Sequence, residues 1–109
     1  MSASAALAAA LQDLEAELRR WGLWSVEPPL AEQLASQAPF CADTMAFEQW
    51  LQWVFIPRIN QLLASGASLP GPCALRPMGE QAFLHLGRRQ ADLLAVLARI
   101  DRHASTLVD

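Results

Sequence analysis

The stretch SAALAAALQDLEAELRRWGL, residues 4–23, decides the fold class of this chain. Apolar residues recur in it at spacings of three and four, which places them on one face of an α-helix. Ser2 or Ser4 can cap the start of this helix, and Gly22 stands where a helix-ending glycine is expected. The pattern therefore predicts an amphipathic helix whose apolar face needs partners elsewhere in the chain. The residues of that face are Leu7, Leu11, Leu14, Leu18 and Trp21.

The same stretch is a poor match to a secretory signal. It lacks a basic start, and Asp13, Glu15 and Glu17 stand where an apolar segment would have to end. No run of about 18 residues in the whole sequence is free of both charge and proline, so a membrane-spanning helix is not expected. Cys41 and Cys73 have neither CxxC nor zinc-like spacing and are expected to be reduced thiols. These features predict a soluble protein in the cytoplasm of a bacterium-like cell, with no membrane association.

A long helix is expected in the middle of the chain. Asp43 or Thr44 can cap its start, and Gly66 ends it after residue 65. Pro57 stands well inside this helix, where a proline ring clashes with the carbonyl four residues back and removes one backbone donor. We therefore expect the helix to be kinked at Pro57, between Trp53 and that proline.

Prolines and glycines divide the rest of the sequence into shorter segments. Residues 67–77 carry three prolines and one glycine and are expected to form a loop. No run of β-branched residues alternates in the way that a strand requires. The remaining expected helices are residues 30–36, 78–86 and 88–105. The predicted fold is thus all-α, a compact antiparallel bundle of three longer and two short helices in one domain spanning residues 1–109.

Composition and motifs argue against several classes of function. The formal charge is −3 and no run of basic residues exists, so autonomous nucleic-acid binding is not expected. The two histidines, His85 and His103, fall on different predicted helices without zinc-binding spacing. The sequence has no GxSxG motif and no glycine-rich phosphate loop. We therefore expect no catalytic residue, no metal and no cofactor.

Two tryptophans one helical turn apart are candidates for a binding surface. Trp50 borders the apolar stripe of the long helix, whereas Trp53 is projected toward the polar side that holds Gln49 and Asn60. A side chain as large as tryptophan in that position is either exposed or covered by a loop. We expect a loop to cover Trp53, with Pro39 and Phe40 or the proline-rich segment as the lid.

Arg58 is projected into the apolar stripe, between Phe47, Leu51 and Leu62. A guanidinium there needs a carboxylate, a free backbone carbonyl or a bound anion. The favoured interpretation is structural, with Glu80 or Glu32 as the partner. The functional alternative is an anion-recognising pocket between helices.

The segment PFCADTMAFEQWLQWVFIPR, residues 39–58, and the later Leu69, Pro70 and Gly71 resemble the YqcC-like family of small bacterial proteins. The resemblance implies a compact helical bundle without an established biochemical activity. Members tend to be encoded beside a tRNA pseudouridine synthase, and some carry that enzyme's name. Such synthases have a larger mixed α/β fold and a catalytic aspartate. This chain has no strand pattern for such a fold, and Asp43 is expected to be a helix cap, so it is not expected to be a pseudouridine synthase.

The predicted function is a non-enzymatic protein-interaction or self-association module with an unknown protein partner, and an accessory role in tRNA modification is one form of this prediction. The alternative is a binder of a small anionic or apolar ligand, or a minor enzyme, that uses an interhelical pocket near Trp50, Trp53 and Arg58. The candidate binding residues are Phe40, Asp43, Trp50, Trp53, Pro57 and Arg58.

Overall fold

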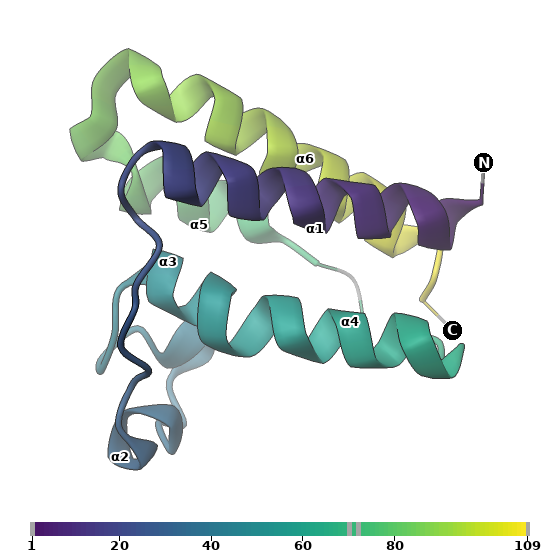
Figure 1. Ribbon diagram of the computed structural model, residues 1–109, viewed down its shortest axis with the longest axis horizontal. Helices are drawn as coiled ribbons and strands as arrows, with labels where there is room; N and C mark the ends of the chain where they lie inside the picture. The colour runs from purple at the N-terminus through teal and green to yellow at the C-terminus, as the bar shows by residue number, and fades with distance from the viewer. Residues whose placement is uncertain (1, 70, 72, 109) are drawn as a thin grey trace.

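The computed structural model describes residues 2–69, 71 and 73–108, and these form an all-α bundle (Figure 1). The first and last helices, α1 and α6, lie side by side, with the middle helix packed beneath α1. The fold class predicted from the sequence is confirmed. The helices are α1 (Ala3–Arg20), α2 (Ala31–Leu34), α3 (Phe47–Trp50), α4 (Ile56–Ser65), α5 (Leu75–Ala82) and α6 (Gln90–Ser105), and 3-10 segments occur at Pro39–Cys41 and Leu84–Arg89.

Helix α1 follows its sequence pattern closely. The hydroxyl of Ser2 accepts a hydrogen bond from the amide of Ala5 at 3.1 Å, so Ser2 is the cap. Gly22 ends the helix with a φ of +72°, in the left-handed region that glycine adopts without strain. The apolar face of α1 packs mainly against α6 and also against α4. The core is built from Leu7, Leu11, Leu14 and Leu18 of α1, Phe47, Leu51, Phe55, Ile56 and Ile59 of the middle helix, Leu75 and Phe83, and Leu93, Val96, Leu97 and Ile100 of α6.

The middle helix begins later than the sequence indicated. Its cap is Ala46, whose amide donates to the side chain of Gln49 at 3.0 Å. The hydroxyl of Thr44 instead donates to the carbonyl of Gln33 at 2.8 Å, which ties this segment to α2. The prediction that Asp43 or Thr44 caps the helix is wrong. The helix starts at Phe47, and the side chain of Gln49, in its first turn, accepts from the backbone amide of Ala46.

Between α3 and α4 the chain forms a π-helical turn at Leu51–Phe55. The amide of Ile56 donates to the carbonyl of Leu51, five residues back. Pro57 follows directly, so the departure from α-helical geometry occurs where the proline predicted a kink. A π-turn inserts one extra residue into a helix and shifts the phase of all later side chains.

Helix α5 starts at Leu75, three residues earlier than predicted. The carboxylate of Asp101 on α6 accepts from the amides of Leu75 at 2.8 Å and Arg76 at 3.0 Å, and so caps α5 from outside. Pro77 lies in the first turn, where a helix makes no use of the missing amide. The sequence reading failed here because the capping group lies far away along the chain.

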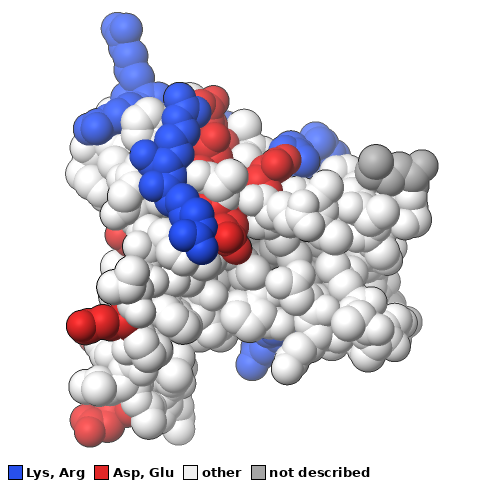
Figure 2. Space-filling model, viewed as in Figure 1, with Lys and Arg blue, Asp and Glu red and all other residues white. Residues whose placement is uncertain are grey.

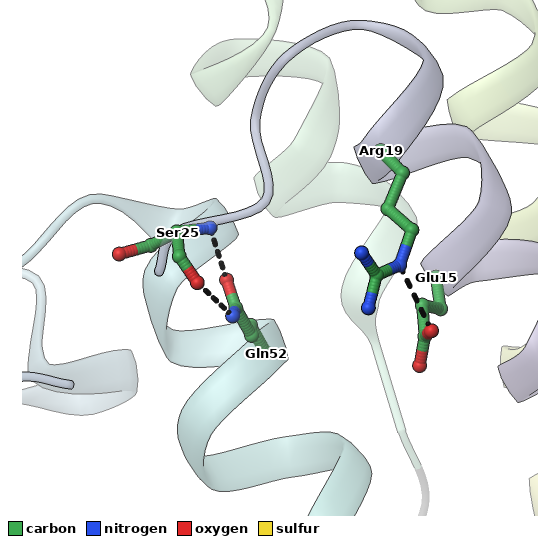
Figure 3. Close-up of polar contacts among 4 residues, drawn as sticks. All are labelled: Glu15, Arg19, Ser25 and Gln52. Carbon is green, nitrogen blue, oxygen red and sulfur yellow. Dashed lines mark hydrogen bonds and ion pairs between the residues drawn. The ribbon is translucent and has the colours of Figure 1, made fainter. Parts of the chain in front are cut away.

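A strap of residues 21–30 connects α1 to α2 and crosses the middle helix (Figure 1). The buried side chain of Gln52, in the π-turn, holds this strap by hydrogen bonds to the backbone of Ser25 (Figure 3). Helix α2 is shorter than predicted, and none of its residues is buried. The strap and α2 expose apolar side chains to solvent, namely Val26, Leu30 and Leu34.

Candidate functional site

A cavity of about 140 Å³ opens between the middle helix and the loop that follows α4. Its walls are almost entirely apolar, and Arg58 is the only charged residue among the described residues that line it. The helical wall consists of Trp50, Val54, Phe55, Arg58, Ile59 and Leu62, and the loop wall of Leu69, Gly71 and Cys73. The sequence suggested an interhelical pocket near Trp50, Trp53 and Arg58. The observed cavity instead lies between a helix and a loop, and of these three residues Trp50 and Arg58 line it.

Trp50 is held in the wall by three neighbouring rings. The Phe40 ring meets it edge-on at a centroid distance of 4.9 Å, and the Phe55 and Phe47 rings lie 5.5 and 6.0 Å away. Phe40 has a φ of 59°, a left-handed conformation that costs a non-glycine residue about 1 kcal/mol or more. The ring contacts with Trp50 and Phe47 offset this cost. Phe40 therefore fixes the orientation of Trp50 rather than covering Trp53.

Arg58 is exposed at the rim of the cavity and does not lie inside the apolar stripe. The predicted pairing with Glu80 or Glu32 is wrong, since Glu80 pairs with Arg76 at 3.5 Å and no carboxylate of the described residues lies within 4 Å of Arg58. The physical reason is the π-turn. One inserted residue rotates α4 by about 100° against a projection with a constant 3.6-residue period.

Trp53 is half-buried and is not among the residues that line the cavity. Its indole nitrogen is buried and has no hydrogen-bond partner among the described residues. Of the proposed lids, Phe40 packs on Trp50 and Phe47. Pro70 and Pro72 of the proline-rich segment, and the side chain of Pro39, lie outside the described part of the structure.

Asp43 and Pro57, the remaining candidates, are both exposed. Asp43 accepts a hydrogen bond from the hydroxyl of Ser36. This contact links the residues just after α2 to the segment that leads into α3. Pro57 lies on α4 directly after the π-turn. Of the six candidates, the structure brings Trp50 and Arg58 together at the cavity, with Phe40 behind Trp50.

Cys73 is the only thiol that lines the cavity among its described residues. Burial raises the pKa of this thiol, and the negative charge of Asp101 raises the pKa further. The thiol is therefore protonated at neutral pH and is a weak nucleophile. Within the described residues, no three histidine, cysteine or acidic side chains are close enough together to hold a metal ion. The cavity thus offers apolar contact and one guanidinium, a combination suited to binding.

The loop wall of the cavity was missed by the sequence analysis. Leu69 is almost fully buried, and its amide donates to the carbonyl of Leu107 at 2.9 Å, near the end of the described chain. This contact draws the loop against the bundle and places Gly71 and Cys73 opposite the middle helix. The three prolines of the loop predicted an irregular path, but nothing local indicated which surface the loop would cover.

Comparison with known proteins identifies the family. A family model described as "tRNA pseudouridine synthase C" matches residues 6–103. Protein YqcC of Escherichia coli is 42% identical over 91 residues, which are 84% of each chain. The chain belongs to the YqcC-like family. An uncharacterised protein of Haemophilus influenzae is likewise 42% identical, over 81% of this chain and 83% of its own.

The solution structure of Escherichia coli YqcC has the same fold. The matched region spans all of this chain and 93% of the YqcC chain in that structure, with a TM-score of 0.85 and 36% identity. Both the family resemblance and the helical bundle that it implied are confirmed. Among the described residues, no helix has the length and apolar character needed to cross a bilayer.

A third relative carries the same name as the family model. The tRNA pseudouridine synthase C of Pectobacterium carotovorum is 50% identical over 60 residues, which are 55% of this chain but only 16% of the synthase. Most of that enzyme has no counterpart here. The synthase name therefore describes a longer protein that contains a YqcC-like segment, and does not indicate synthase activity for this chain.

Proposed function

We propose that this chain is a non-enzymatic interaction module that binds a tRNA pseudouridine synthase. The observation that supports this partner most directly is the YqcC-like segment inside the much longer Pectobacterium synthase. Joining two partners in one chain makes their contact intramolecular, with effective concentrations of about 1 mM, so even a weak natural interface is then populated. In the present protein the same contact would form between two separate chains.

The cavity at Trp50 and Arg58 suits the capture of one anchoring side chain. Its volume of about 140 Å³ is close to that of the apolar cavities of about 150 Å³ that admit benzene, so it fits one ring or one branched aliphatic group. Interfaces commonly concentrate their binding energy in such an anchor. The guanidinium of Arg58, with no acidic partner among the described residues, can pair with a carboxylate next to that anchor.

The same geometry supports a second candidate function. A small aromatic or branched aliphatic carboxylate could place its apolar part against Trp50 and its charge at Arg58. Such a ligand would bind without any partner protein. Self-association remains a third reading of the same apolar surface.

Calorimetric titration of the chain into the pseudouridine synthase C of its own organism tests the proposal. We expect saturable binding that is at least tenfold weaker with Val54→Trp, which fills the cavity, and with Arg58→Glu, which reverses the rim charge. Val26→Trp and Arg102→Glu make the same changes at exposed positions outside the cavity and should bind normally. Denaturation curves confirm that each variant is folded.

Three results would count against it. No heat of binding at about 100 µM of each protein rejects the synthase as partner. An equal loss of affinity with the cavity variants and with their controls would show that the interface lies outside the cavity. A co-purifying small carboxylate that is lost with Val54→Trp would instead support the ligand-binding function.

A further inference from the structure

Half of the arginines of this protein gather at one end of the bundle, although they come from two distant parts of the sequence. Arg19 and Arg20 end α1, and Arg88 and Arg89 lie in the 3-10 turn that precedes α6. Figure 2 shows basic side chains concentrated at the end of the molecule where α1 finishes and α6 begins. We call these four residues the arginine end.

Two tryptophans order three of the four guanidinium groups of this end. The Arg20 guanidinium lies 4.6 Å from the ring centre of Trp21, and that of Arg89 lies 5.8 Å from the same ring. The Arg19 guanidinium lies 4.7 Å from the ring centre of Trp24. Cation–π contacts of this kind hold the planar group in place and reduce the entropy lost when it binds an anion.

The acidic residues nearby neutralise only part of this charge. Glu15 pairs with Arg19 at 3.0 Å, and Arg20 pairs with Glu17 at 3.5 Å and Asp92 at 3.3 Å. Arg88 and Arg89 have no carboxylate within 4 Å among the described residues. The arginine end therefore combines four arginines with three acids, whereas the rest of the chain has four arginines and eight acids. The protein is acidic overall but has one positive end.

We propose that the arginine end contacts the phosphate backbone of the tRNA while the chain is bound to its synthase. This inference rests on the proposed function, because the excess charge is too small for autonomous binding and needs a partner to hold the RNA nearby. Arginine forks pair with phosphate oxygens in two-pronged geometry, and the indole rings beside them suit the sugar and base faces of a nucleotide. The apolar cavity provides the protein contact, and the arginine end faces the RNA.

The test compares two double variants in the assembled complex with the synthase. Arg88→Gln with Arg89→Gln removes the two charges of the arginine end that have no carboxylate partner among the described residues; the Arg89 side chain also donates to the carbonyl of Leu86 at 3.2 Å. Arg76→Gln with Arg102→Gln removes two charges from exposed positions elsewhere and is the matched control. The affinity for an unmodified transcript of the synthase's substrate tRNA is measured between 50 and 300 mM salt, alongside the affinity of each variant for the synthase.

At about 150 mM salt we expect the first double variant to bind the transcript about tenfold more weakly, with a logarithmic salt slope lower by one to two. The control should stay within twofold, and both variants should bind the synthase normally. Equal tRNA affinity for the two variants overturns this inference while leaving the proposed function intact. Failure of the unmodified chain to join the synthase overturns both.

Discussion

Gln52 hydrogen-bonds to both backbone groups of Ser25 with its single side-chain amide. Its Oε1 accepts from the Ser25 amide at 2.8 Å, and its Nε2 donates to the Ser25 carbonyl at 2.6 Å (Figure 3). Gln52 is 6% exposed and is the only buried polar side chain among the described residues. A residue of the π-turn thus fixes the strap that leads from α1 to α2.

Gln52→Leu should lower the free energy of unfolding by about 1–3 kcal/mol, because it leaves a backbone donor and acceptor of Ser25 without partners at a half-buried position. Gln61→Leu, the same change at an exposed position of α4, is the control and should stay within about 0.5 kcal/mol. Chemical denaturation of both variants measures the difference. Equal midpoints would show that water replaces the amide without cost.

Trp53→Phe should cost little or nothing, because it removes a buried indole donor that has no partner among the described residues. Trp21→Phe is the matched comparison, since the Trp21 indole donates to the Glu17 carboxylate at 3.1 Å. We expect that second variant to lose about 1–2 kcal/mol. Thermal denaturation compares the two. A larger loss at Trp53 than at Trp21 would mean that the Trp53 indole has a partner after all.

Asp101→Asn should lower the pKa of Cys73 but leave it above the ordinary value of 9.0, because burial, the larger cause of the increase, remains. The rate of iodoacetamide alkylation against pH, measured in a Cys41→Ser background, reports this midpoint. The chain has no tyrosine or lysine to titrate in the same range. An unchanged midpoint would rule out an influence of Asp101.

The raised pKa of Cys73 also predicts how stability changes at alkaline pH. The folded state holds the thiol proton more tightly than the unfolded state, so its contribution is complete below the ordinary pKa of 9.0 and is lost as pH rises through the folded value. Cys73→Ala should therefore lose less stability than the unmodified chain between pH 8 and pH 11. Denaturation midpoints at several pH values measure this, and parallel curves would contradict it.

Pro57→Ala should keep the π-turn, although it restores the backbone donor that the proline lacks. Removing the extra residue would rotate α4 by about 100° relative to α3. Phe47 and Leu51, before and at the start of the turn, and Ile56 and Ile59, after it, are all buried, so one of these pairs would then leave the core. A solution structure of the variant decides the matter, and a continuous α-helix through residue 57 would show that proline alone imposes the turn.

The sequence predicted those parts of the fold that depend on local pattern. The leucine spacing of α1, a serine cap at Ser2 or Ser4, and its terminal Gly22 were all predicted, and so was the irregularity before Pro57; the structure selects Ser2 as the cap. The predicted position of Arg58 was wrong because a projection with a constant helical period does not include the residue that a π-turn inserts. The sequence also failed to predict the cap of α5, which Asp101 supplies from another helix.

The candidate site was predictable only on its helical side. Trp50 and Arg58 were identified from the middle helix alone, whereas the loop wall depends on the contact between Leu69 and Leu107. The arginine end was missed for a similar reason. Two adjacent arginines at each of two distant places form no basic run, and only the packing of α1 against α6 brings them together.

That packing of α1 against α6 also has a consequence for the protein as it is being made. The ribosome completes the leucine face of α1 early, but the helix that covers most of it begins only at Gln90. At about 5–20 residues per second, several seconds separate the two. Throughout that interval the nascent chain carries an uncovered row of leucines, an obvious target for a chaperone at the tunnel exit. A premature stop before α6 would release a polypeptide that cannot bury this row and would be cleared by proteolysis or lost to aggregation.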